Sequence, residues 1–179
     1  MKQALAGPLT EHPVTTAMGP RTVEMIKKVT VTLRTSTQEA GFEILYRTAE
    51  TLQDSRVFVG LAGREFRCST GQGGKLLAGS VETFVFGRDS NVVSAAANDP
   101  THRTMADVRA YPVYIRFEPM PNASDPQEDD WCLEHVRLGV EGTEGSRVDL
   151  VGLEGPERLF MGSDGGHFLY LQPGAPHTW

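Results

Sequence analysis

The sequence predicts an all-β fold: an antiparallel β-sandwich of two roughly four-stranded sheets with a short helical insert. Three segments carry this prediction, because polar and apolar residues alternate in them with the period of two that half-buried strands show. The third segment also passes from an acidic loop into a tryptophan, which indicates a strand anchored by a large ring. The three segments are 28–35, 57–67 and 129–140.

The other strands follow from the same alternation, bounded by Gly, Pro, Asn or Asp. They are expected at 81–87, 113–118, 148–151, 158–162 and 167–171. The last two flank the run from Ser163 to Gly166, whose Asp164-Gly165 step tolerates the positive φ angles of a tight turn. We therefore expect the last two strands to pair as a hairpin.

Two segments lack the strand pattern. In 41–52, Phe42, Leu45, Ala49 and Leu52 recur at helical spacing, which predicts a short amphipathic helix between strands. Residues 1–22 are rich in Pro, Gly and Thr and have little periodicity. We expect them to form an N-terminal arm, with a single domain over 23–179.

Composition and charge exclude several classes of protein. The chain has 179 residues, 17 basic against 23 acidic, and a net charge of −6, without a basic cluster that could neutralise phosphates, so nucleic acid is not an expected partner. No apolar stretch reaches the length of a membrane span, and the N-terminus lacks a signal-peptide core. We expect a cytoplasmic protein that meets membranes at most at their surface. Its two cysteines, Cys68 and Cys132, are expected to be buried, reduced thiols.

The segments also carry a resemblance to a known family. The most specific piece is DWCLEHV, from Asp130 to Val136, and weaker pieces are VFVGLAGREFRC from Val57 and the strands at 81–87 and 113–117. Together they resemble the PLAT, or lipoxygenase-homology, domain. Its members are two four-stranded sheets packed face to face, and they mostly serve as lipid-surface or protein-docking modules. The resemblance therefore implies a stand-alone binding module for a lipid-like or apolar small molecule, or for a protein partner.

An enzyme remains the alternative. The sequence has no Gly-x-Ser-x-Gly nucleophile elbow, its glycine cluster at 71–75 lacks the residues of a phosphate loop, and its histidines have no His-x-x-x-His spacing. A cofactor-independent cyclase or isomerase acting on an apolar substrate needs none of these, because orientation and one or two polar groups are enough. Its candidate catalytic residues are Glu43, Tyr46 and His102.

Aromatic residues are the candidates for contact with an apolar ligand. Relative to PLAT members, the chain has an apolar insert between Gly41 and Asp54, which can cap a pocket, form a partner surface or simply extend the core. Tyr114 alternates with Ile115 and Phe117, and the sequence leaves open which set is buried. The candidate ligand-binding residues are Phe42, Tyr46, Tyr114, Arg116 and Trp131.

Acidic and amide side chains at loop–strand junctions suggest a calcium site, because oxygen-rich loops at one end of a sandwich hold hard cations. Some PLAT members bind calcium in this way. The same residues also suit turns, where Asp and Asn bond to the nearby backbone. The candidate ligands are Asp54, Asn98, Asp99, Asp129 and Asp130, and no other cofactor is expected.

Overall fold

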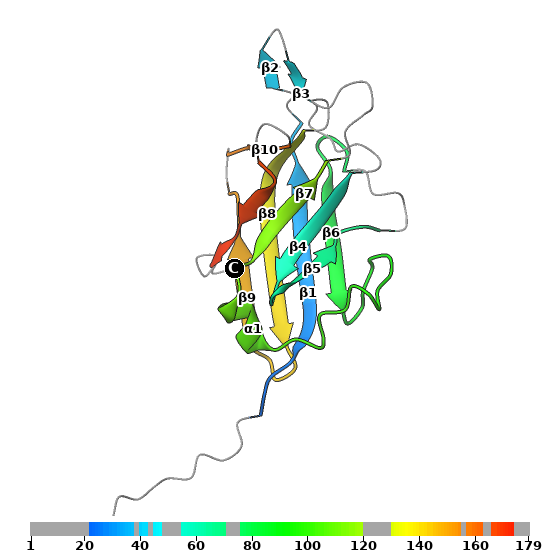
Figure 1. The fold of residues 1–179 in the computed structure, drawn as a ribbon, viewed down its shortest axis with the longest axis vertical. Helices are drawn as coiled ribbons and strands as arrows, with labels where there is room; N and C mark the ends of the chain where they lie inside the picture. The colour runs from blue at the N-terminus through cyan, green and yellow to red at the C-terminus, as the bar shows by residue number, and fades with distance from the viewer. Residues whose placement is uncertain are drawn as a thin grey trace, which may run out of the picture.

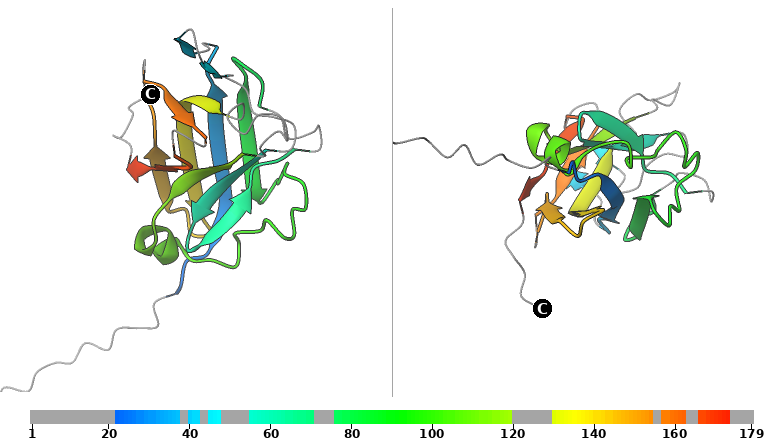
Figure 2. Two further views of the ribbon diagram at one scale, coloured as in Figure 1. Left: turned by 45° about the horizontal axis from the view of Figure 1, so that its top comes forward. Right: turned by 90° about the horizontal axis from the view of Figure 1, so that it is seen from below.

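The computed structural model describes residues 22–37, 40–42, 45–47, 55–70, 76–119, 130–154, 157–162 and 166–173. Over these residues the chain forms two antiparallel sheets that pack face to face, which confirms the sandwich (Figures 1 and 2). The expected arm, apart from Thr22, lies outside the described residues.

The larger sheet is built around two long central strands. Its order is β12-β9-β8-β1-β6, and β10 pairs with β8 off this path. Alternation along the central strands buries one face of each against the smaller sheet. Its strands are β1 (Ile26–Thr35), β6 (Val81–Gly87), β8 (Trp131–Gly142), β9 (Arg147–Val151), β10 (Leu159–Met161) and β12 (Gln172–Pro173).

The smaller sheet has the order β11-β7-β4-β5. Its first hairpin closes through Ala62 and Gly63, whose φ angles of 51° and 74° suit a two-residue turn between twisted strands. Its strands are β4 (Arg56–Leu61), β5 (Arg64–Arg67), β7 (Tyr114–Glu118) and β11 (Phe168–Tyr170).

The predicted helix over 41–52 is wrong where the structure describes the insert. Two short strands, β2 (Ala40–Phe42) and β3 (Leu45–Arg47), form a separate two-stranded sheet there. Register pairs Phe42 with Leu45. The spacing of three that suggested a helical face is also the spacing of the closing pair of a two-residue hairpin, so periodicity alone could not separate them.

The predicted pairing of the last two strands is also wrong. β10 pairs with β8 in the larger sheet, whereas β11 pairs with β7 in the smaller one. Gly162 and Gly166 form an isolated bridge, so the chain does reverse at the expected place. A local turn signal therefore predicts where the chain reverses, but packing in the core decides which sheet each strand joins.

One short helix lies in the connection between β6 and β7. It is α1 (Met105–Ala110), at the end of the sandwich where β8 ends (Figure 1). The Thr104 hydroxyl accepts a hydrogen bond from the Asp107 N–H over 3.0 Å, and the Asp107 carboxylate accepts one from the Thr104 N–H over 2.9 Å. This capping box satisfies donors that the first turn leaves unpaired.

Trp131 connects the two sheets in the core, as the expected anchor. Its side chain is fully buried, its Nε1–H donates to the Thr35 hydroxyl over 3.1 Å, and its ring centre lies 5.7 Å from that of Phe117. Cys68 and Cys132 are buried and unpaired, as predicted. Ile115 and Phe117 also point inward, so their neighbours on β7 point out of the smaller sheet.

Candidate functional site

The outer face of the smaller sheet gathers the side chains that β7 turns away from the core. Register sets two rows across its four strands, in the order β11, β7, β4, β5. We call this surface the aromatic face and define it by Phe58, Glu65, Tyr114, Arg116, Phe168 and Tyr170. One row reads Tyr170, Tyr114, Gly60, Glu65, and the next reads Phe168, Arg116, Phe58, Arg67.

Tyr114 lies flat across the neighbouring strand because Gly60 has no side chain. A Cβ atom at Gly60 would lie 2.2 Å from Cζ of the Tyr114 ring, so only glycine permits this placement. The Tyr114 hydroxyl donates to Oε1 of Glu65 over 3.2 Å. Burial, and next the negative charge of Glu65, raise the pKa of Tyr114, which keeps its hydroxyl protonated as the donor.

Arg116 is the centre of a polar network on this face. Its Nε and Nη2 atoms donate to the two carboxylate oxygens of Glu65 over 2.7 and 2.8 Å, and Nη1 donates to Glu118 over 2.9 Å. The guanidinium lies 4.2 Å from the centre of the Phe58 ring. The hydrogen bonds from Arg116 hold the pKa of Glu65 below its ordinary value. The network therefore fixes side chains from three strands.

Two large rings lie exposed beside this network. Phe168 is 50% exposed and Tyr170 is 60% exposed, and their rings are parallel to within 16°. The Tyr114 ring meets both of them edge-on, with centres 5.4 and 5.8 Å away. Rings of this size contribute most to stability when they are buried. Their exposure on a rigid support makes this pair of rings a candidate contact surface.

An open groove of about 430 Å³ adjoins the rings at one end of the aromatic face. It lies where β7 ends and β11 begins, and the Nδ1 atom of His167 lies 3.2 Å from the carbonyl oxygen of Phe117 there. The groove offers room for a side chain of a binding partner. Its lining residues are Arg116, Phe117, Glu118, Pro119, His167 and Phe168.

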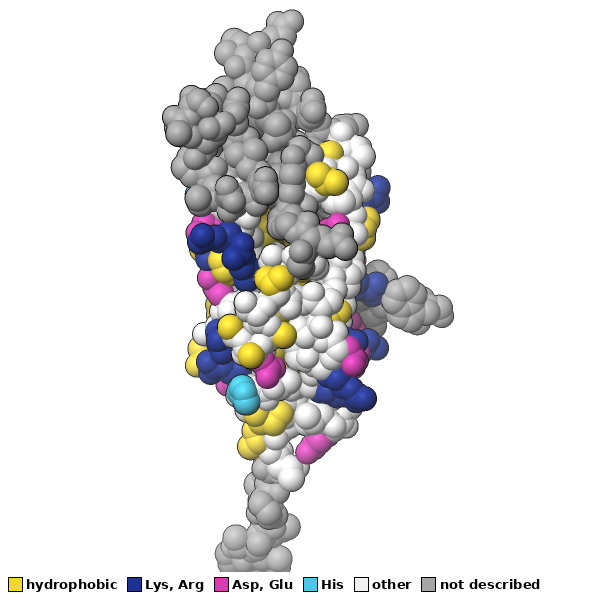
Figure 3. All heavy atoms as spheres, turned by 90° about the vertical axis from the view of Figure 1, so that its right-hand side faces the viewer, with side chains coloured by type: hydrophobic (Ala, Val, Ile, Leu, Met, Phe, Trp, Pro, Cys, Tyr) yellow, Lys and Arg dark blue, Asp and Glu magenta, His cyan; other side chains and the backbone are white. Residues whose placement is uncertain are grey.

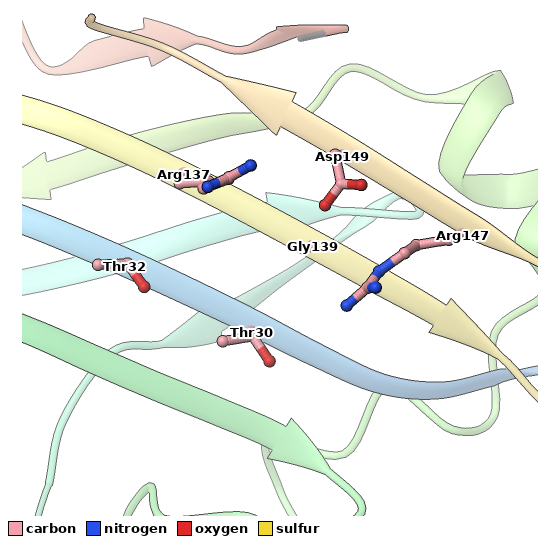
Figure 4. Close-up of a pocket in the computed structure, with 6 residues that line it drawn as sticks. All are labelled: Thr30, Thr32, Arg137, Gly139, Arg147 and Asp149. Carbon is pink, nitrogen blue, oxygen red and sulfur yellow. The ribbon is translucent and has the colours of Figure 1, made fainter. Parts of the chain in front are cut away.

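The outer face of the larger sheet is different in character, and we call it the polar face. Its centre is a shallow hollow of about 250 Å³, lined by Thr30, Thr32, Arg137, Gly139, Arg147 and Asp149 (Figure 4). Register places Gly139 between Thr30 and Asp149. The ion pair of Arg147 with Glu141 spans 3.3 Å between side chains that are 65% and 38% exposed.

The structure brings together only some of the predicted site residues. Tyr114 and Arg116 are neighbours on the aromatic face. Trp131 was also expected to bind a ligand, but its side chain is fully buried, which leaves its ring no surface for a ligand. The side chain of His102 is 84% exposed and 3.9 Å from Asp99, so it does not lie in an enclosed pocket. Glu43 and the side chains of Phe42 and Tyr46 lie outside the described part of the chain.

The candidate calcium ligands serve structural roles where their bonds are visible. Asn98 is buried, accepts from the Arg67 N–H and donates to the Val93 carbonyl, both over 2.9 Å. Asp99 accepts from the Thr101 N–H over 2.9 Å, as in a turn. Asp130 is buried, and Asp54 and Asp129 lie outside the described residues. Among those described, no three His, Cys, Asp or Glu side chains form a group suited to a metal, and the calcium site stays a prediction.

Sequence reasoning missed the exposed rings of Phe168 and Tyr170 and the glycine that supports Tyr114. Two signals were present. Aromatic residues at alternate positions of a predicted strand share one face, and a glycine inside a strand often marks a close approach of another group.

Comparison with known proteins adds no family to this description. A scan against models of protein families finds no match to the chain, and a search of curated proteins finds none either. The resemblance to the PLAT domain therefore remains a prediction. In the part of the chain that the structure describes, no helix is long and apolar enough to cross a membrane.

Proposed function

We propose that this chain is a non-enzymatic binding module that docks a protein partner on its aromatic face. The observation that carries the proposal is the pair of half-exposed rings, Phe168 and Tyr170, held against a fixed Tyr114. Interface residues that contribute most to binding are enriched in aromatic residues and arginine. The resemblance to PLAT domains, which mostly serve as docking modules, agrees with this class of function.

Preorganisation supports the same proposal. Binding costs free energy when side chains must be ordered at the interface. Here Tyr114 is confined over Gly60, and Arg116 is held by bonds to Glu65 and Glu118. A partner would therefore meet a surface whose central residues are already in place, with a groove beside Phe168 for one of its side chains.

The charges favour a protein over an anionic lipid surface. Arg116 bonds to both Glu65 and Glu118, and Glu118 also pairs with Arg56 over 3.2 Å. Two arginines and two glutamates make the centre of the face neutral. Attraction to anionic lipid grows with each unbalanced lysine or arginine near the surface, and the two rows of this face add only one further arginine, Arg67, on the edge strand β5.

Site-specific photo-crosslinking in the cell that makes the protein tests the proposal. A photoreactive benzoylphenylalanine in place of Tyr170 probes the aromatic face, and the same residue in place of Thr83, exposed on the outer side of β6, is the matched control. We expect a discrete adduct with another polypeptide from position 170 and none from position 83. Lipid adducts from position 170, or the same adducts from both positions, would contradict protein docking by this face.

A further inference from the structure

The described edges of the two sheets differ in how their backbone groups are satisfied. On β6, the Asn91 side chain accepts from the Val85 N–H over 2.7 Å and donates to the Thr83 carbonyl over 2.8 Å. On β5, the outward N–H of Arg67 donates to the Asn98 side chain. Figure 3 shows the side of the molecule on which β6 lies, where acidic, basic and apolar side chains are interspersed. Sealed edges of this kind prevent pairing with another chain.

Among the described residues, no side chain seals the edge formed by β11 in this way. The Phe117 N–H donates to the His167 carbonyl over 2.9 Å, and the Leu171 N–H donates to the Val113 carbonyl over 2.8 Å. In an antiparallel ladder the bonding direction alternates along the strand. The N–H and C=O groups of Phe168 and Tyr170 therefore point away from β7, and among the described strands β11 pairs with β7 alone.

We propose that a second copy of this chain pairs with this edge, joining the two β11 strands antiparallel about a two-fold axis at Leu169. The outward groups of Phe168 then exchange two hydrogen bonds with Tyr170 of the partner subunit, and those of Tyr170 exchange two with Phe168 of the partner subunit. Every outward backbone group of β11 is satisfied by this one arrangement. The two smaller sheets become one continuous sheet.

The side chains make a second copy the occupant that fits this edge. Paired residues of antiparallel strands point to the same side of a sheet, so each Phe168 ring lies beside a Tyr170 ring on the outer face. On the inner face, the partly buried Leu169 meets its own counterpart. No like charges lie opposite each other, and β11 contains neither a charged residue nor a proline to discourage pairing. Because β11 has only three residues, its backbone hydrogen bonds form a small interface. Contacts between the rings are therefore needed to stabilise the dimer.

The dimer goes beyond the docking function and does not require it. It places two aromatic faces side by side on one surface, although each face remains available to a partner. A cross-linked adduct of twice the chain mass reports self-pairing, whereas an adduct with a different polypeptide reports docking. The two proposals can therefore fail separately.

Sedimentation velocity of the purified chain over a wide range of concentrations tests the pairing. We expect a monomer–dimer equilibrium that Phe168→Pro weakens by at least about tenfold more than Phe168→Ala. Both variants remove the ring, but only proline removes the outward N–H, and β7 does not use that N–H. A chain that is monomeric at every concentration, or a dimer that both variants weaken equally, would overturn the proposal.

Cysteine cross-linking gives a second readout that does not depend on dimer affinity. Across the two-fold axis, the Leu169 residues form a non-hydrogen-bonded pair, whose Cα separation of about 4.5 Å is within the span of a disulfide. Leu169→Cys should form a linked dimer on mild oxidation, while Leu77→Cys, at a position 54% exposed elsewhere, should not. Cys68 and Cys132 are buried and do not compete. Equal cross-linking of the two variants would contradict the arrangement.

Discussion

The two outer faces of the sandwich cover the same core but carry different chemistry. On the aromatic face, long side chains bond to one another and support exposed rings. On the polar face, threonines and a glycine leave a shallow hollow, and the Arg147–Glu141 ion pair is largely in water. Folding is driven by burial of the inner faces and does not require bonded networks or aromatic rings among the outward residues. The difference is why we propose the aromatic face, and not the polar face, as the docking surface.

Two glycines show the contrast at a single atom. Gly60 on β4 and Gly139 on β8 each lie within a strand and on an outer face. The space above Gly60 is filled by the Tyr114 ring, whereas a Cβ atom at Gly139 would only touch a carboxylate oxygen of Asp149, 3.4 Å away. Gly60 therefore lets a ring pack over its strand, whereas the surface above Gly139 stays open.

The largest expected effect comes from filling these two positions. Gly60→Ala forces Tyr114 off the sheet and separates it from Glu65, and overpacking of this kind costs about 2–3 kcal/mol of unfolding free energy. Gly139→Ala should change stability by less than about 0.5 kcal/mol or raise it slightly, because glycine weakens strands. Urea denaturation of both variants measures the difference, and equal losses would remove the distinction between the faces.

A smaller effect is expected from removing one arginine from each face. Arg116→Met deletes hydrogen bonds to two carboxylates and should cost about 2 kcal/mol at neutral pH. Arg147→Met removes an exposed ion pair, which contributes less than about 0.5 kcal/mol. Denaturant melts of the two variants under one buffer provide the comparison, and a loss at Arg147 as large as that at Arg116 would show that the network adds nothing.

The contribution of the network should depend on pH in a defined direction. Arg116 lowers the pKa of Glu65 from its ordinary 4.5 in the folded chain. A depressed carboxyl pKa stabilises the fold fully above 4.5 and loses that contribution as pH falls through the lowered value. The stability gap between the wild type and Glu65→Gln should therefore be constant above pH 5 and shrink in acid. A gap that widens in acid would assign the interaction to another group.

Among variants of the aromatic face, the smallest effect on stability is expected at the exposed rings. Phe168→Ser and Tyr170→Ser should each lower the unfolding free energy by about 1 kcal/mol or less, because each ring keeps contact with Tyr114 but is half exposed or more. The same variants should lose the protein adduct that forms at the aromatic face. Thermal melts and cross-linking yields, measured on the same preparations, separate folding from docking. Variants that fold and still form the adduct would move the docking surface elsewhere.

Period-two patterns were sufficient to predict the sandwich, because one side of each strand must be buried. The burial of Ile115 and Phe117 confirms the expected alternation on β7, in which Tyr114 was placed on the opposite side from these two residues. The sequence could not decide which side faced outward. That choice depends on which sheet the strand joins and what packs against it.

Features that depend on distant partners were not predictable from local pattern. The Asp-Gly turn after β10 was expected to join a hairpin, but β10 and β11 belong to different sheets. The caps that Asn91 and Asn98 provide for strand edges likewise have no sequence signature, because they depend on where a loop lies in space. By contrast, the Thr104–Asp107 spacing was a local signal for α1 that was overlooked.

Hydroxyl-radical footprinting tests the central claim, that the aromatic face is a contact surface, most directly. Oxidation of Phe168 and Tyr170 is compared between the purified chain, diluted until it is monomeric, and the protein in extract of the cells that make it, with Tyr111, 51% exposed, as the internal reference. We predict that Phe168 and Tyr170 lose most of their oxidation in the extract while Tyr111 keeps its own. Unchanged oxidation of both rings, or equal protection of Tyr111, would contradict the account.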